Sequence, residues 1–187
     1  MEQKDEISYV KRILDGETEL FSVFLDSYSH SLYSLIVQIV RCPEDAEELV
    51  QDVFLKAFRH LQRYKGECRF STWLYRIAYN EAISATRKKK QEYFCIEESI
   101  INNLPDEKIE NLMDPTEDEE KIICLGQAID DLNTEERFLI TLFYYEDKSL
   151  EEISQIMSVT VGNVKVKLHR TRKKLYVLMS ERYGNKE

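Results

Sequence analysis

The sequence predicts an all-α protein with two small helical domains joined by an acidic linker, and the second domain is expected to contain a helix-turn-helix. Glycine and proline are scarce, with 5 and 3 among 187 residues, and the alternating β-branched runs typical of strands are hard to find. Apolar side chains instead recur every three or four residues over most of the chain. With 43% hydrophobic and 33% charged residues, the chain is able to bury a core.

The charge distribution divides the chain into three parts. The net charge is −9, yet residues 1–90 contain 14 basic and 14 acidic side chains. Residues 91–120 contain 11 acids and one lysine, and residues 121–187 carry a net charge of +1. The acidic segment also contains Pro105 and Pro115 and has weak apolar periodicity. We therefore expect domains at 1–90 and 121–187 with a linker at 91–120, which leaves both domains free to have basic faces.

The first domain is expected to begin with three helices. A short amphipathic helix, Glu6–Leu14, ends at Asp15-Gly16, a pair typical of turns. A long helix, Thr18–Val40, follows with apolar residues at helical spacing. The third helix, Pro43–Leu61, begins with a proline that suits the first helical position and with acids that favour a helix N-terminus.

A fourth helix follows the loop RYKGECRF and is expected to reach about Lys90, with Ser71 or Thr72 as its N-cap. Its buried stripe would contain Leu74, Ile77, Ala78, Ala82 and Ala85. A second stripe contains Trp73, Arg76, Asn80, Ser84 and Arg87. Aromatic rings beside cations suit unstacked bases, because stacking contributes about 1–3 kcal/mol per base.

The loop before this helix adds further cations and aromatics: Arg63, Tyr64, Lys65, Arg69 and Phe70. A base extruded from a duplex can be held in such a pocket, which offsets part of the cost of opening the strands. Ordinary core packing of Trp73 and of the loop aromatics is the alternative interpretation.

The second domain is expected to contain four helices. The first two are Thr116–Asp130 and Thr134–Tyr145, the latter capped by Asn133 with Glu136. Ser149 with Glu152 forms a capping box for a short helix that ends near Met157. After the turn Ser158-Val159-Thr160, a final helix reaches about Tyr183.

The last two helices match the helix-turn-helix arrangement. One face of the final helix is apolar and must dock on the domain: Val161, Val164, Leu168, Thr171, Leu175 and Leu178. The remaining surface is expected to carry Lys165, Lys167, Arg170, Arg172, Lys173 and Lys174, with no acid from Val161 to Ser180. Such a surface favours a polyanion. Candidate base contacts are Asn163, Lys165 and Val166, and candidate phosphate contacts are Lys167, Arg170 and Arg172; a merely solvated cationic face is the alternative.

Other classes of site find little support. Cys42, Cys68, Cys95 and Cys124 lie more than twenty residues apart, and the three histidines are equally scattered, so neither a metal nor any other cofactor is expected. No apolar stretch reaches the ~18 residues of a membrane span. The start of the chain has no apolar signal core, so we expect a cytoplasmic protein without direct membrane insertion. An enzyme is the least favoured class, since no Gly-rich phosphate loop or nucleophile–base pair is present.

Three stretches resemble the extracytoplasmic-function (ECF) sigma factors of the bacterial sigma-70 superfamily. They are PEDAEELVQDVFLKAF, then FSTWLYRIAYN followed by RKKK, then LEEISQIMSVTVGNVKVKLHRTRKKL. The resemblance covers roughly Phe21–Lys90 and Gln127–Leu178, and three such stretches in this order are far more specific than any one of them.

The resemblance implies an alternative sigma factor with region 2 at 1–90 and region 4 at 121–187. Region 2 would bind the β′ clamp helices of core RNA polymerase through Asp45, Glu48, Gln51 and Asp52. The −10 element would be recognised and melted by Lys65, Arg69, Phe70, Trp73, Arg76, Asn80 and Arg87. The final helix would recognise the −35 element, while region 4 rests on the β flap and the linker occupies the polymerase channel that later holds RNA. An anti-sigma factor is also an expected partner.

Two other functions remain open at this level. A stand-alone helix-turn-helix regulator would bind a two-fold symmetric duplex site without polymerase. A helical adaptor that binds only proteins would show little salt dependence of DNA affinity.

Overall fold

The computed structural model describes residues 3–88, 101, 103–105 and 119–184, and secondary structure within these ranges is helical, which confirms the all-α prediction. In the first domain the elements are α1 (Gln3–Leu14), η1 (Thr18–Phe21), α2 (Ser22–Val40), α3 (Pro43–Arg59), η2 (Leu61–Arg63) and α4 (Phe70–Lys88). In the second they are α7 (Glu119–Asp130), α8 (Thr134–Ile140), η3 (Thr141–Tyr145), α9 (Leu150–Met157) and α10 (Val161–Gly184). The linker prediction, 91–120, lies mostly outside the described residues.

Several helix ends differ from the predicted ones. The long helix begins at Ser22, because residues 18–21 form a 3₁₀ turn whose Glu19 carbonyl accepts a hydrogen bond from the Ser22 hydroxyl (2.9 Å). The third helix ends at Arg59 and is followed by a second 3₁₀ turn. Neither Ser71 nor Thr72 caps α4, since the helix already begins at Phe70.

Both predicted capping boxes are confirmed. The Asn133 side chain accepts from the Glu136 N–H (2.9 Å), and the Glu136 carboxylate accepts from the Asn133 N–H (3.0 Å). Ser149 and Glu152 form the same reciprocal pair at the start of α9. The helix predicted for Thr134–Tyr145 is confirmed in its range, but its last part is π-helical: α8 continues directly into η3, which ends at Tyr145.

The first domain packs its helices around an aromatic centre. Phe24 of α2 and Phe70 of α4 are fully buried, and their rings stack with centroids 4.0 Å apart. Tyr28 and Tyr64 lie against the same Phe70 ring. The start of α4 is therefore fixed by packing against α2.

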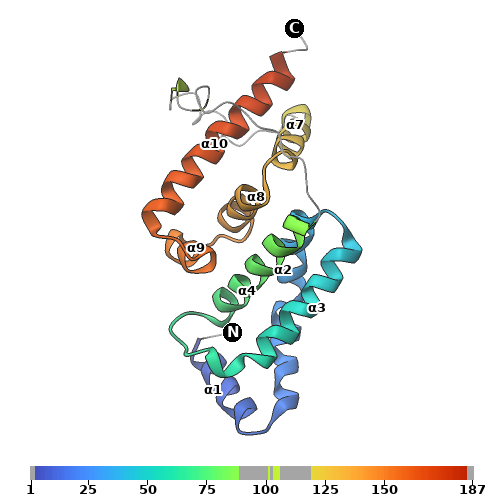
Figure 1. The fold of residues 1–187 in the computed structure, drawn as a ribbon, viewed down its shortest axis with the longest axis vertical. Coiled ribbons are helices and arrows are strands. Elements are labelled where there is room, and N and C mark those ends of the chain that lie inside the picture. Colours follow the sequence, from blue (N-terminus) through green and yellow to red (C-terminus); the bar gives the residue numbers. More distant parts are fainter. Residues whose placement is uncertain (1–2, 89–100, 102, 106–118, 185–187) are drawn as a thin grey trace.

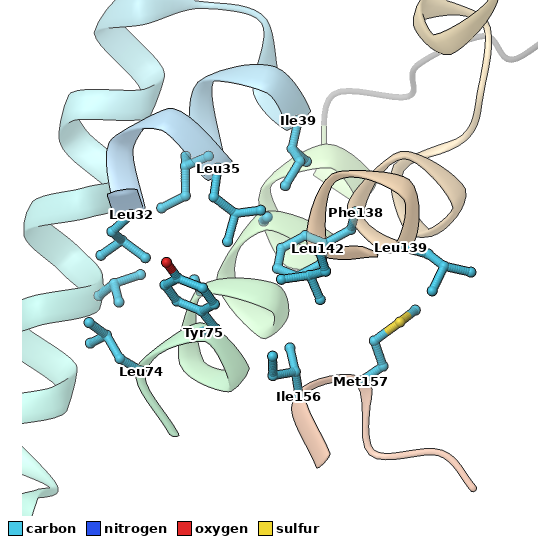
Figure 2. Packing of buried hydrophobic residues seen from close by; sticks show 14 of the residues in the cluster. Leu32, Leu35, Ile39, Leu74, Tyr75, Phe138, Leu139, Leu142, Ile156 and Met157 are labelled. Carbon is cyan, nitrogen blue, oxygen red and sulfur yellow. The ribbon is translucent and has the colours of Figure 1, made fainter. Parts of the chain in front are cut away.

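The two domains share one continuous core, because α4 lies against α8 and α9 (Figure 1). Figure 2 shows Tyr75 of α4 between α2 side chains on one side and Phe138, Leu142 and Ile156 on the other. Phe138 is fully buried and meets the Tyr79 ring edge to face at 5.0 Å. Burial raises the pKa of Tyr79 to about 12, so this phenol stays neutral at physiological pH.

Polar contacts also join the domains. The Tyr75 hydroxyl donates to the Glu146 carboxylate at 2.8 Å. Arg137 is only 1% exposed. Its guanidinium donates to the carbonyls of Asp130, the last residue of α7 (2.9 Å), of Leu132 just after it (2.8 Å), and of Ile39 in α2 (2.9 Å). Because helix C-termini leave carbonyls without partners, one buried arginine satisfies the ends of two helices from different domains.

Candidate nucleic-acid interface

The helix-turn-helix of the second domain is formed by α9, a tight turn and α10. Ser158 adopts the left-handed conformation (φ 58°), and its N–H donates to the Ser154 carbonyl, which ends α9. The Thr160 hydroxyl accepts from the Asn163 N–H at 3.2 Å and caps α10. The turn is thus set by local hydrogen bonds, and it presents the first turns of α10 to solvent.

The faces of α10 divide largely as its periodicity predicts. Val164, Leu168, Thr171, Leu175 and Leu178 are buried, and Val161 is half-buried. The candidate base contacts Asn163, Lys165 and Val166 are all exposed near the N-terminus of the helix, and Val166 is 58% exposed. An apolar side chain exposed to this extent has no core to fill, so its surface is free to contact a ligand.

Two of the six predicted surface cations are not on the surface. Lys173 and Lys174 are 8% and 7% exposed, so the prediction that they are solvated is wrong. Their stems are buried while their ammonium groups find partners: Lys174 pairs with Glu136 at 2.8 Å, and Lys173 donates to the Leu104 carbonyl at 2.8 Å. These two lysines hold α10 against α8 and the segment near Leu104.

The candidate phosphate contacts lie on the outer part of α10. Arg170 is exposed, and Lys167 is half-exposed and pairs with Glu135 at 3.0 Å. The Arg172 Nε donates to the Tyr144 hydroxyl at 2.7 Å, and its guanidinium carbon lies 5.5 Å from the ring centroids of both Phe143 and Tyr144. These aromatic contacts orient Arg172 before any ligand is bound. Periodicity does not predict a role for Phe143 and Tyr144, because it is the fold of η3 that brings them beside α10.

The second candidate surface is the outer face of α4. Arg76, Asn80, Ser84 and Arg87 are exposed and follow one another at steps of three and four. Trp73 is half-buried, and its ring lies 5.6 Å from that of Tyr64 and 5.5 Å from that of Phe70. The structure therefore brings the predicted α4 residues together on one face, with Trp73 partly in the core.

The loop before α4 presents its cations but not its aromatic side chains. Lys65 and Arg69 are exposed. Phe70 is fully buried, so the expectation that it is presented to DNA from the loop is wrong: its ring completes the aromatic centre beneath α4. Tyr64 is also buried, and its hydroxyl donates to the Cys68 carbonyl at 2.8 Å within the loop. Core packing explains both aromatics.

The third candidate surface lies on α3. Glu48, Gln51 and Asp52 are exposed and Asp45 is half-exposed. Beside them, a groove of about 560 Å³ separates α3 from η1 and α2. Its walls are mainly apolar and include Phe21, Leu25, Val50, Phe54, Leu55 and Phe58, with Gln51 at its edge. Leu55 is 51% exposed and Phe58 is 40% exposed. Helical periodicity alone does not predict this groove, because it cannot distinguish an exposed apolar side chain such as Phe58 from a core residue.

In the part of the chain that the structure describes, no group of three or more His, Cys, Asp or Glu side chains is placed to hold a metal ion. Within the same residues, no helix is both long and apolar enough to span a bilayer.

Comparisons with protein families match both domains. Residues 24–92 match Sigma-70 region 2, and residues 122–175 match Sigma-70, region 4. The chain is 30% identical over 179 residues to the ECF RNA polymerase sigma factor SigW of Bacillus subtilis, which covers 89% of this chain and 92% of SigW. It is 31% identical over 177 residues to the ECF RNA polymerase sigma-E factor of Escherichia coli K12, covering 91% of this chain and 92% of that protein.

Solved structures show the same fold. CnrH, in complex with the cytosolic domain of CnrY, matches with a TM-score of 0.65 and 19% identity over 92% of this chain and 96% of CnrH. The sigma factor RpoE, in complex with the anti-sigma factor NepR from Bartonella quintana, matches with a TM-score of 0.61 and 22% identity over 86% of this chain and 96% of RpoE.

Proposed function

The chain belongs to the ECF sigma factors of the sigma-70 family, and we propose that it recognises promoters with α10 and α4 and binds polymerase with α3. As an alternative sigma factor it directs RNA polymerase to promoters. A stand-alone helix-turn-helix regulator is not supported, because the relatives match over 92% of their own lengths, through both domains. The domain bounds 1–90 and 121–187, with the linker between them, are part of the proposal.

One observation carries the assignment of the two DNA surfaces: the domain contacts leave both surfaces exposed. The second domain packs on the face of α4 that contains Tyr75 and Tyr79. Arg76, Asn80 and Arg87 lie on another face and stay accessible. Tertiary packing therefore accounts for the apolar side of α4 and leaves its polar side without a structural role.

We assign the −35 element to α10. In the major groove Asn163 has the groups for an adenine, Lys165 for a guanine, and Val166 for a thymine methyl group. Lys167, Arg170 and Arg172 are assigned to phosphates, which set the register of the helix on DNA. The contacts of Arg172 with the Phe143 and Tyr144 rings support this role. A guanidinium that is already oriented loses less side-chain entropy when it binds a phosphate.

We assign the −10 element to α4 and its loop. Trp73 offers a partly exposed ring for stacking, while Arg76, Asn80 and Arg87 offer polar contacts along one face. Lys65 and Arg69 extend this face with positive charge that suits the strand backbone. Phe70 is not assigned to a direct contact with DNA, because it is buried. Its ring packs against Trp73 and supports it from below.

We assign polymerase binding to the acidic edge of α3 together with the groove beside it. Asp45, Glu48, Gln51 and Asp52 suit a basic partner, and the adjacent groove suits its apolar side chains. The partner proposed for this surface is the pair of β′ clamp helices, with the β flap as the support of the second domain.

Regulation by a second protein is also proposed. CnrH and RpoE were each solved with a bound partner, CnrY and the anti-sigma factor NepR. We propose that an anti-sigma factor binds this chain as well, that the chain works in the bacterial cytoplasm, and that it has no catalytic site or cofactor of its own.

Transcription in vitro with core polymerase and genomic DNA tests the proposal. Start sites mapped by sequencing are expected to share two upstream elements, and base changes in each element should affect initiation. Charge reversal on α10 should remove dependence on the upstream element alone. Initiation that ignores this reversal would remove α10 from the proposal.

A further inference from the structure

The N-terminal helix α1 contacts the loop that leads into α4. The side-chain amide of Gln3 donates to the Gly66 carbonyl at 3.0 Å, a contact between residues 63 positions apart. Gly66 has a positive φ of 73°, and a methyl group there would lie 2.9 Å from Ile7 Cδ1. The middle of the loop therefore rests directly on α1 and requires glycine.

Glu6 makes the second contact, at the end of the loop. One carboxylate oxygen accepts from the Phe70 backbone N–H at 2.8 Å, and the other accepts from the Tyr28 hydroxyl at 2.5 Å. Glu6 is only 1% exposed, although its neighbours Asp5 and Ser8 on the same helix are exposed. The carboxylate acts as a distant N-cap of α4, where negative charge is favoured by the helix dipole.

Burial of Glu6 and Tyr28 keeps the two hydrogen bonds of the Glu6 carboxylate in place. Burial, and then the hydrogen bond to Glu6, raise the pKa of Tyr28 well above its ordinary value, so Tyr28 remains a donor. A buried carboxylate is costly unless its oxygens are satisfied. Here both oxygens have donors, one from α2 and one from the first residue of α4, so Glu6 ties three helices together.

The loop held by these two contacts carries candidate strand contacts. Lys65 and Arg69 are exposed within residues 64–69, and the Tyr64 hydroxyl bonds the Cys68 carbonyl across the loop. The loop is thus fixed at Gly66, at Phe70 and internally. A site of this kind is preformed, and a base that enters it loses less free energy to ordering of the protein.

We propose that Glu6 is a positioning residue for capture of the −10 strand: by capping α4 at Phe70, it holds the loop and Trp73 in the geometry that accepts an extruded base. This inference rests on the proposed role of the loop and α4. Glu6 is buried away from the exposed face of α4, so it acts through Phe70.

The test measures how much holoenzyme affinity depends on a single base. Full-length protein with core polymerase is bound to forked promoter DNA, in which one abasic site is moved through the −10 strand. At the captured position, loss of the base is expected to weaken wild-type binding by ~10-fold, the scale of base–aromatic stacking. This penalty is a ratio of two affinities, so a fraction of misfolded protein cancels from it.

Four variants decide the outcome. Glu6→Ala is expected to reduce the penalty to below ~3-fold, because the capture site is no longer preformed. Glu6→Gln keeps an acceptor for the Phe70 N–H and should restore most of the penalty. Asp5→Ala removes the same charge from an exposed position of the same helix and should leave the penalty unchanged. Gln3→Ala, which loses only the Gly66 contact, should lower it by ~2-fold and decides the matter if Glu6→Ala does not fold.

The possible results distinguish a failure of the role proposed for Glu6 from a failure of the role proposed for the loop and α4. If Glu6→Ala and Gln3→Ala lower overall affinity but keep the wild-type penalty, both residues are merely structural and the inference is overturned. If wild-type holoenzyme shows no abasic penalty at any position, the proposed role of the loop fails and takes this inference with it. A penalty that is present in wild type and lost in Glu6→Ala supports both.

Discussion

Lys165 and Arg172 lie two turns apart on α10, and their side chains are held very differently. Lys165 is exposed near the start of the helix, whereas the Arg172 guanidinium packs against the rings of Phe143 and Tyr144. A base contact must adapt to one sequence, but a phosphate contact meets the same group at every site. The two residues therefore suit specificity and general affinity, respectively.

Lys165→Glu is expected to abolish recognition of the upstream element. The reversal replaces an attractive contact with repulsion at the groove, while the core of the domain is untouched because Lys165 is exposed. Competition between native and scrambled −35 duplexes should show a loss of at least about 1–3 kcal/mol of discrimination. Binding to core polymerase should stay within about twofold of wild type, and Gln127→Glu, at an exposed position of α7, is the control.

Asn80→Ala is expected to slow promoter opening with little change in polymerase binding. Asn80 is exposed, and its amide donates only to the Arg76 carbonyl of its own helix (3.0 Å) among the bonds seen, so the substitution leaves the core intact. Opening is followed with a fluorescent base in the −10 element. Trp73→Ala should impair opening more, but it also removes packing with Tyr64 and Phe70 and should lower thermal stability. Equal loss of opening and of polymerase binding in Asn80→Ala would contradict the assignment.

At the level of whole elements, α9 owes its start to the capping box of Ser149 and Glu152. Ser149→Ala should destabilise the protein by about 1 kcal/mol, the usual cost of losing such a cap. Differential scanning calorimetry should show a decrease in melting temperature of about 2–4 °C. Ser180→Ala, at an exposed position of α10, is the control and should leave the melting temperature unchanged.

Leu55→Ser tests the groove beside α3. Leu55 is 51% exposed, so the fold loses little when it becomes polar, whereas a partner seated in the groove loses an apolar contact. The affinity for core polymerase should fall by about fivefold to thirtyfold, equivalent to one or two kcal/mol. Leu14→Ser has the same exposure but lies at the end of α1, outside the groove lining, and should bind like wild type. Equal effects of both variants would argue against the groove.

Periodicity and capping patterns were enough to predict most helices, the exposed face of α4 and most of the exposed face of α10, where Lys173 and Lys174 are the exceptions. The contacts that periodicity cannot predict join residues far apart in the chain. From the sequence, Glu6 is indistinguishable from a surface acid of an amphipathic helix. It is buried because it caps α4, whose first residue lies 64 positions further along the chain. Phe70 follows a polar loop, and the sequence alone leaves both a DNA contact and core packing open; its stacking partner in the core, Phe24, lies 46 positions away. Apolar faces that serve the contact between domains look no different from faces that serve one domain.

At the scale of the whole molecule, the two helices proposed to bind DNA, α4 and α10, belong to domains that pack against each other. Helix α4 contacts α8 and α9 (Figure 1), and Arg137 and Tyr75 make hydrogen bonds across the same boundary. Elements at −10 and −35 lie roughly 25 base pairs apart, or about 85 Å at about 3.4 Å per base pair. Domains packed against each other cannot span this distance, so the proposed roles of α4 and α10 predict that the domains separate on the promoter.

Energy transfer between fluorophores at Gln38 of α2 and Tyr145 of η3 should report this separation, because both positions are exposed and Gln38 lies 3.3 Å from the Thr141 hydroxyl of the same η3 turn. Transfer is expected to be high in the free protein and to fall when holoenzyme forms on promoter DNA. The measurement requires labels introduced as non-natural side chains, because the native cysteines include the buried Cys124. High transfer in the promoter complex would contradict separation of the domains.

Tyr75→Phe makes the energy-transfer measurement quantitative, because it should change the population of the separated form by a predictable amount. The substitution keeps the ring that packs between the domains and removes only the hydroxyl that donates to Glu146. Loss of a hydrogen bond to a charged group costs about 1.5–3 kcal/mol, so the separated form of the free protein should gain roughly tenfold or more in population relative to the closed form. If separation precedes binding, the apparent affinity for core polymerase should rise in the same proportion, because only the separated form is competent. A variant that opens without binding more tightly would show that polymerase first binds the closed form and separates the domains afterwards.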